Sequence, residues 1–289
     1  MRSPALLSLR ASITLCAIFL TSSCSAIISG FTNSIAEDLS AAVLGSLDFG
    51  VVEEGLPAYL LLVDALVEGN PNDAALLNTA AMLNGSYASG FVEDESRRQY
   101  FATKGKQLAL RASCQHKQAF CDFLDAPFVE FRKRINNTSI RDIEYLYILA
   151  SNWSGWIQAH SADYVAIAEL PKAKYLMEHV IKLDATYARG SPFIYMGVFA
   201  TFLPAALGGE PEVGRENFER AIEISDGENL YAKSMMAEMY ARAIFDRDLH
   251  DRLVTEVLES DPEAGDLTLQ NVVAQKLALQ LKESADDFF

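Results

Sequence analysis

The chain has 289 residues, of which 50% are hydrophobic, and its formal net charge is -15. This hydrophobic content excludes a disordered chain, and the acidic character argues against a nucleic-acid-binding protein, because phosphate recognition needs a basic footprint. After residue 23 the sequence contains no apolar run long enough to cross a bilayer, so we expect no spanning segment there.

The first 23 residues have the layout of a secretory signal. Arg2 and Arg10 are their only charged residues, and the apolar run 13–20 is followed by small residues up to Cys24. A cysteine directly after small residues resembles a bacterial lipobox, in which the thiol is acylated and the preceding segment is removed. The pattern departs from the usual lipobox because Leu20 lies four positions before the cysteine instead of three.

Cys24 is therefore the predicted lipidation site and the first residue of a lipoprotein held at the membrane by acyl chains. Ser25 follows it, which by resemblance to enterobacterial lipoproteins favours the outer membrane over the inner membrane. The alternative is an ordinary cleaved signal and a periplasmic protein without an anchor. The predicted organisation is a signal peptide over 1–23, a tether over 24–34 and a single helical-repeat domain over 35–289.

Helical patterns fill the chain after the tether, and strand patterns are nearly absent. Pro57 is predicted to open a helix that ends at Gly69. Asn70 is then the predicted N-cap of a second helix over about 72–89, with Pro71 at its first position. Two helices joined by so short a turn form an αα-hairpin.

Two further cysteines, Cys114 and Cys121, lie in a compartment that allows disulfides. On a straight helix their Cα atoms would be about 10 Å apart, whereas a bridge needs less than about 7 Å. A disulfide between them therefore requires the helix to break near residues 115–117, and two buried thiols are the alternative. The spacing fits neither a zinc site nor a thioredoxin-like site.

An aromatic stripe is predicted on a helix that starts near Arg141. Its members follow helical spacing and include both tryptophans of the chain, a histidine and a carboxylate. Large aromatic residues beside a few polar groups suit a ligand groove or an interface, whereas helical spacing also suits a core face. The candidate ligand or partner surface consists of Trp153, Trp156, Ile157, His160, Asp163 and Tyr164.

The C-terminal half repeats pairs of helices at intervals of about 35–41 residues. Such a period is typical of a tetratricopeptide-like solenoid, in which each hairpin packs on its neighbours. The predicted fold is therefore all-α, an array of tetratricopeptide-like helical hairpins. The predicted helices of this half are 170–184, 193–203, 210–224, 228–245 and 249–260.

Catalytic signatures are missing from the sequence. It contains no nucleophile elbow, no zinc-protease motif, no Walker loop and no Rossmann glycine fingerprint. The four histidines are scattered singly without metal-ligand spacing. The sequence thus predicts no catalytic residues, no metal site, no cofactor and no enzymatic activity.

Several blocks of sequence carry a family resemblance. The most diagnostic runs over 203–212 and continues through 218–222. The others are 57–64, 87–92, 153–157, 168–171, 269–275 and 286–289. Together they resemble the TRAP-transporter-associated T component (TatT) family of bacterial lipoproteins, over roughly residues 35–289.

The resemblance implies a lipid-tethered periplasmic protein that forms a homotrimer. It also implies docking of a periplasmic solute-binding protein, the P component of a TRAP transporter, which imports small organic acids and related solutes. No enzymatic activity belongs to the family, and binding of a small or apolar ligand by the chain itself is left open. The alternative function is a tetratricopeptide-like scaffold lipoprotein for the assembly of envelope complexes.

Overall fold

The computed structural model describes residues 38–122, 126–203 and 205–289. Within these ranges the regular elements are all helices, so the prediction of an all-α fold is confirmed. The predicted signal peptide, Cys24 and the tether lie outside the described residues. None of the described helices combines the length and the apolar character that crossing a bilayer requires.

The helices follow one another with short connections. A helical stretch over 38–44 precedes α2. The N-terminal helices are α2 (Phe49–Gly69), α3 (Ala74–Gly90), α4 (Glu95–His116), η1 (Gln118–Phe120), α5 (Phe128–Asn136), η2 (Ile140–Asp142), α6 (Ile143–Ala159), α7 (Tyr164–Ala168) and α8 (Leu170–Leu183). The C-terminal helices are η3 (Tyr187–Gly190), α9 (Ser191–Thr201), η4 (Ala205–Leu207), α10 (Pro211–Ile224), α11 (Leu230–Met235), η5 (Met236–Ala241), α12 (Arg247–Glu259), η6 (Gly265–Leu267), α13 (Thr268–Glu283) and α14 (Ala285–Phe288).

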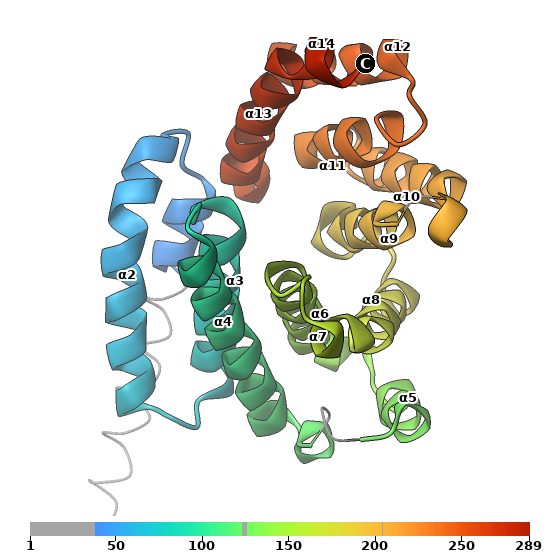
Figure 1. Cartoon of the computed structure of the whole chain (residues 1–289). Coiled ribbons are helices and arrows are strands. Elements are labelled where there is room, and N and C mark those ends of the chain that lie inside the picture. Colours follow the sequence, from blue (N-terminus) through green and yellow to red (C-terminus); the bar gives the residue numbers. More distant parts are fainter. Residues whose placement is uncertain (1–37, 123–125, 204) are drawn as a thin grey trace, which may run out of the picture.

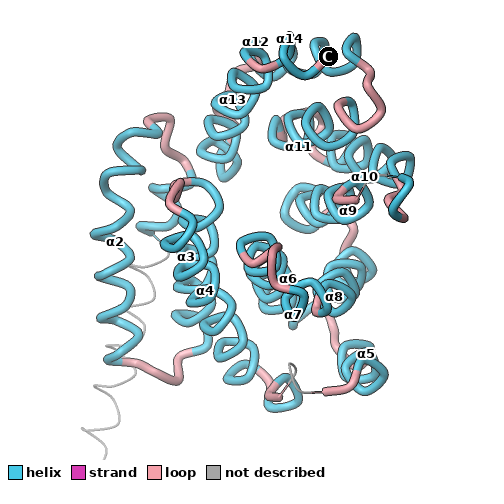
Figure 2. Tube along the Cα trace, viewed as in Figure 1, coloured by secondary structure: helices cyan, strands magenta, loops and turns pink. Residues whose placement is uncertain are grey.

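The helices are arranged along a curved path that returns to its beginning (Figure 1). Neighbours in the chain pack on one another: α3 on α4, α6 on α8, α9 on α10, and both α11 and α12 on α13. The last long helix, α13, also contacts α2, where Lys276 Nζ lies 4.2 Å from the centre of the Phe49 ring. The path is helical throughout, with loops only at the connections (Figure 2). Paired helices agree with the predicted array, whereas the tetratricopeptide-like repeat itself stays a prediction.

The two predicted helix starts in the N-terminal hairpin are wrong. α2 begins at Phe49, with Asp48 as its N-cap, and Pro57 lies inside it. The missing N–H of Pro57 leaves the carbonyl of Glu53 without its helical donor, and both residues are exposed, so water can satisfy that carbonyl. α3 begins at Ala74, where Asp73 Oδ1 accepts the Leu76 N–H at 3.1 Å.

The predicted helices of the C-terminal half are found with small shifts at their ends. α8, α10 and α12 correspond to 170–184, 210–224 and 249–260, and α9 to 193–203. The segment predicted as one helix over 228–245 is instead α11 followed by η5, which is a π-helix. A π-helical turn widens the spacing of side chains, so one uniform helical face does not run through it.

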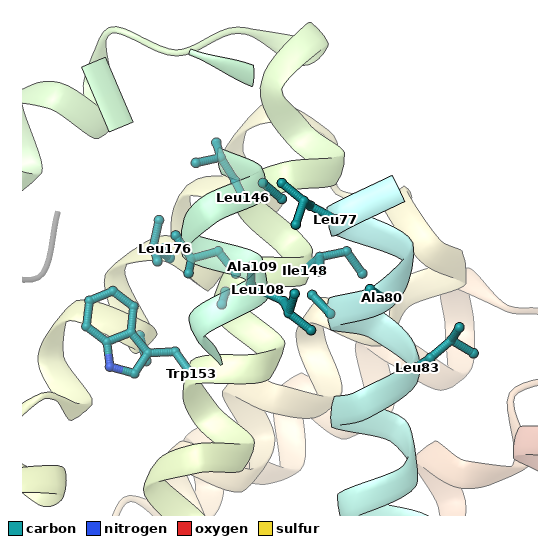
Figure 3. Packing of buried hydrophobic residues seen from close by; sticks show 14 of the residues in the cluster. Leu77, Ala80, Leu83, Leu108, Ala109, Leu146, Ile148, Trp153 and Leu176 are labelled. Atoms are coloured by element: carbon teal, nitrogen blue, oxygen red, sulfur yellow. The ribbon is translucent and has the colours of Figure 1, made fainter. Parts of the chain in front are cut away.

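The main core lies between α2, α3, α4, α6 and α8. Figure 3 shows side chains from several of these helices meeting there, among them Leu77, Leu108 and Trp153. Trp153 is completely buried, and Phe131 of α5 packs edge-on against it with ring centres 6.1 Å apart. Burying one large apolar side chain contributes roughly 1.5–3 kcal/mol, so this core supplies much of the stability. A second core joins α10, α11, α12 and α13.

Small residues allow α3, α4 and α6 to cross closely. A Cβ atom on Gly85 or Gly105 would lie only 2.4 or 2.3 Å from Asn152 Oδ1. Asn152 is buried, and its Nδ2 donates to the Ile148 carbonyl at 2.9 Å. Only glycine at both positions leaves room for the side chain of Asn152 between the helices.

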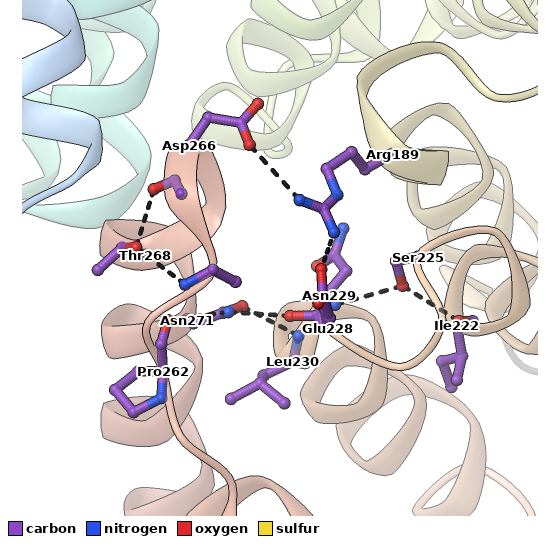
Figure 4. A network of polar contacts seen from close by, with 12 residues as sticks. Arg189, Ile222, Ser225, Glu228, Asn229, Leu230, Pro262, Asp266, Thr268 and Asn271 are labelled. Atoms are coloured by element: carbon purple, nitrogen blue, oxygen red, sulfur yellow. Dashed lines mark hydrogen bonds and ion pairs between the residues drawn. The ribbon is translucent and has the colours of Figure 1, made fainter.

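A strained turn links α8 to α9. Ala188 and Arg189 have φ values of 47° and 51°, in the left-handed region that non-glycine residues rarely adopt. Gly190 follows with φ 81°, and a Cβ there would lie 3.1 Å from the backbone of Ala221. The turn directs Arg189 towards Glu228 and towards Asp266 of η6, just before α13 (Figure 4).

Candidate functional site

The structure divides the predicted aromatic stripe into core residues and surface residues. Trp153 and Ile157 are buried in the main core, with 0% and 4% exposure, and Trp156 is half-buried. α6 ends at Ala159, and His160 is its C-cap. The stripe is therefore not one continuous helical face, which corrects the prediction from spacing.

The last two stripe residues belong to the next helix. Asp163 is the N-cap of α7, and its Oδ1 accepts the Val165 N–H at 2.8 Å. Tyr164 is 90% exposed and Val165 68% exposed. His160 Nδ1 lies 2.9 Å from the Trp156 carbonyl oxygen, and the two rings lie 5.0 Å apart. The α6–α7 turn thus presents an aromatic and apolar surface beside a half-buried histidine.

A partly buried ion pair lies against Trp156, beside this turn. Lys106 of α4 donates to Glu169 Oε2 at 2.5 Å, and the same oxygen accepts the indole N–H of Trp153 at 2.6 Å. The Lys106 side chain is 8% exposed. Burial lowers the pKa of Lys106, and the hydrogen bond and charge of Glu169 oppose that shift. The pair connects α4, α6 and the start of α8, so we assign it a structural role.

Cys114 and Cys121 form a disulfide with their Cα atoms 4.5 Å apart. The bridge is possible because α4 ends at His116, inside the interval where a break was required. The chain then turns through η1, whose Phe120 is buried in the main core. The disulfide therefore holds the end of α4 against the short helix that follows it.

A cavity of about 580 Å³ lies where the beginning and the end of the array meet. Its walls come from the helical stretch 38–44, α3, α6 and η6. Glu144 and Asp266 line it from two different elements, and Asn78 Nδ2 donates to Glu144 Oε1 at 2.9 Å. This volume falls within the range of about 300–1,000 Å³ that is usual for small-molecule sites.

Three tyrosine side chains, from α6, η3 and α9, pack together. The rings of Tyr147 and Tyr187 lie 5.3 Å apart, and those of Tyr147 and Tyr195 lie 6.3 Å apart, in edge-to-face arrangements. Burial, followed by the charge of Glu144, raises the pKa of Tyr187 to about 12. Burial also raises the pKa of Tyr195 to about 12. These phenols therefore stay protonated at neutral pH.

The sequence analysis did not identify the cavity residues. Glu144 and Ile148 have helical spacing, which places them on one face of α6, but that signal is common. Their proximity to Asp266 follows only from the closure of the array. Among the described residues, no group of three histidine, cysteine, aspartate or glutamate side chains is placed to hold a metal ion.

The sequence matches a known protein family. Residues 45–289 match the model of a family described as TRAP transporter T-component. No curated protein matches the sequence. The matched range begins in the turn before α2 and ends at residue 289. It therefore includes the α6–α7 turn and most of the residues that line the cavity.

Proposed function

This chain belongs to the TRAP transporter T-component family, and from that membership we propose that it docks the periplasmic solute-binding P component of a TRAP transporter. Membership makes the chain an accessory component of a TRAP system. The match over residues 45–289 is the observation that carries the proposal. Experiments have to test three parts of this proposal: the identity of the P component, the surface on which it docks, and the lipid anchor.

The proposed location is the periplasmic side of the outer membrane, with acyl chains on Cys24 as the anchor. The support is the basic start, the apolar run and the small residues that precede this cysteine. Cys24→Ser should move the protein out of the membrane fraction or leave its signal uncleaved. A variant that stays membrane-bound with normal processing would refute lipidation.

The proposed docking surface is the α6–α7 turn. Tyr164 and Val165 are highly exposed there, and Trp156 and His160 lie beside them only half-buried. Exposed aromatic residues beside a polar group are typical of the residues that dominate the binding energy of an interface. The family also suggests a homotrimer, which a closed rotational assembly would satisfy.

Co-purification tests the function directly. The full chain should be isolated from membranes of its own host and its partners identified by mass spectrometry. We expect a periplasmic solute-binding protein together with transporter subunits. Recovery of secretion or cell-wall proteins without a solute-binding protein would instead favour the scaffold function.

Variants of the turn test the surface. The double substitution Tyr164→Ser and Val165→Ser should weaken binding of the purified P component about tenfold, as expected for residues near the centre of an interface. His160→Ala should also weaken it, with little change in melting temperature. Leu61→Ser is the matched control, because Leu61 is an equally exposed apolar residue, 71% exposed, on α2 and not on the α6–α7 turn. Equal binding by all variants would exclude this surface.

A ligand-binding role for the chain itself is proposed at the cavity between the beginning and the end of the array. The support is its volume of about 580 Å³ and its mixed polar and apolar wall. A ligand seated there would contact the helical stretch 38–44, α3, α6 and η6 together. Its binding would therefore stabilise the closed arrangement of the array.

A further inference from the structure

The short helix α5 is basic, although the chain as a whole is acidic. Its residues include three bases and one acid, a net charge of +2, whereas the whole chain has a net charge of -15. The acid, Glu130, lies 3.4 Å from Arg134 Nε and 3.9 Å from Lys133 Nζ. Arg132 has no ion pair or hydrogen bond with any residue that the structure describes. Its positive charge is therefore not compensated by a carboxylate.

The spacing along α5 separates a core side from an outer face. Phe131 and Ile135 are completely buried, and the helix packs on α8. The outer face follows offsets of three, four and seven residues, which lie on one side of a helix. It consists of the exposed residues Val129, Arg132, Lys133 and Asn136.

This outer face is hollowed and carries donors. A hollow of about 340 Å³ is lined by its four residues and by Asn137, and no acidic residue of the described chain lines it. Tyr175 of α8 donates to Asn136 Oδ1 at 2.8 Å, which leaves the amide N–H groups of Asn136 available. Guanidinium, ammonium and amide donors without a carboxylate suit the oxygen atoms of an anionic group such as a phosphate.

Aromatic rings hold the unpaired guanidinium beside apolar surface. Arg132 Cζ lies 5.0 Å from the centre of the Tyr175 ring and 5.9 Å from that of Phe128. These contacts orient the group without neutralising its charge. Phe128 is 39% exposed and Val129 81% exposed. Cations next to exposed apolar side chains are the combination found in helices that lie at a membrane surface.

We propose that the outer face of α5 docks on the surface of a bilayer that contains anionic phospholipid. Arg132 and Lys133 meet lipid phosphates, and Val129 and Phe128 enter the boundary between headgroups and acyl chains. α5 lies at the periphery of the array, where a flat surface can reach it (Figure 1). The same surface repels the acidic remainder of the chain, so this contact selects which side of the protein faces the membrane.

A fluorophore on α5 tests the proposal. The full chain with Val129→Cys is labelled with a nitrobenzoxadiazole maleimide without reductant, and the unsubstituted chain treated in the same way is the blank. It is reconstituted with phosphatidylcholine alone or with about 30% phosphatidylglycerol. We expect the emission to shift to shorter wavelength only with phosphatidylglycerol, and to shift back in about 0.5 M NaCl. This readout works with or without an acyl chain on Cys24, so its failure is separate from failure of the anchor.

Charge variants connect the shift to α5. Added to Val129→Cys, the pair Arg132→Gln and Lys133→Gln should remove most of the shift, because each lost cation weakens attraction to an anionic surface about fivefold. Both side chains are exposed and glutamine is a good helix former, so the variant should fold. The matched control is the pair Arg252→Gln and Lys282→Gln, which removes two exposed cations from α12 and α13 and should keep the shift.

Three results would overturn the proposal. They are the absence of a shift with phosphatidylglycerol, an equal shift with phosphatidylcholine alone, and an equal loss of the shift in the control pair. The remaining alternative is an acidic protein surface as the occupant of this face. If the Arg132 and Lys133 variant loses co-purification of the P component while the label does not respond to phosphatidylglycerol, the face is a protein interface and the lipid proposal is wrong.

Discussion

The ammonium group of Lys106 lies 3.3 Å from the centre of the Trp156 ring. The same group donates to Glu169, so one buried cation joins α4 to α6 and to the start of α8. Two residues earlier on α4, Lys104 pairs with Asp64 of α2, but both of these side chains are more exposed, at 23% and 34%. Substituting each lysine in turn therefore tests how the burial of an ion pair changes its contribution to stability.

Lys106→Met should lower the free energy of unfolding by about 2–4 kcal/mol, because it leaves the Glu169 carboxylate without its cation in a mostly buried site. Lys104→Met should cost less than about 1 kcal/mol, as expected for a more solvated pair. Urea unfolding followed by circular dichroism measures both. Similar losses in the two variants would contradict the structural role assigned to the Lys106 pair.

His179 should make stability depend on pH. Thr138 Oγ1 donates to the Ile135 carbonyl and therefore accepts from His179 Nε2, at 2.8 Å in each case. Burial, followed by the charge of Lys182, lowers the pKa of His179 below its ordinary value of 6.5. As the pH falls below about 6.5, the unfolded chain binds a proton that the folded chain does not, so stability falls until the pH passes the lowered pKa.

The comparison of wild type with His179→Gln isolates this contribution. Glutamine can still donate to Thr138 but does not titrate. The stability advantage of wild type over the variant should shrink from pH 7.5 to pH 5, with a slope of at most about 1.4 kcal/mol per pH unit. A constant difference across this range would show that the folded chain does not hold His179 neutral.

Two glycine-to-alanine substitutions should change the stability of the fold in opposite directions. Gly105→Ala should destabilise the fold by about 1–3 kcal/mol, because the new methyl group would overlap Asn152 between α4 and α6. Gly155→Ala should stabilise it by about 0.5–1 kcal/mol, since Gly155 lies inside α6 with nothing within 4 Å of its Cβ position. Thermal unfolding reports both, and a loss of stability in Gly155→Ala would contradict the open space on that face.

Reduction of the disulfide should cost about 2–3 kcal/mol, the range expected for a short closed loop. Replacing both Cys114 and Cys121 by serine should produce the same loss and make stability insensitive to reductant. Without reductant, neither thiol should react with a maleimide in the unfolded wild-type chain. Labelling of both would show that the bridge is absent in solution.

Periodicity predicted the helices well where a single face is buried. α8 matches its predicted span because Leu176 and Val180 repeat on the core side, and α10 matches because Phe218 and Ala221 do the same. Helix starts were harder to predict. Proline suits the first helical position, and that preference does not reveal a proline tolerated on an exposed face, as at Pro57.

The predicted stripe shows where spacing stops being informative. The offsets from Trp153 to Tyr164 fit one helical face only if the helix continues past Ala159, but it ends there. The spacing correctly placed Trp153 and Ile157 on a common face, which is the core face. The cavity could not be predicted, because Asn78, Glu144 and Asp266 belong to segments that only the tertiary fold brings together.

The contact between α13 and α2 changes how the molecule can unfold. In an open array of hairpins each unit meets only its neighbours, so the ends fray first and stability grows with the number of units. Here the terminal units support each other through contacts such as Lys276 with Phe49. Loosening either end therefore exposes the other, which favours a single cooperative unfolding transition. An added hairpin would have to separate α13 from α2 instead of extending an open end of the array.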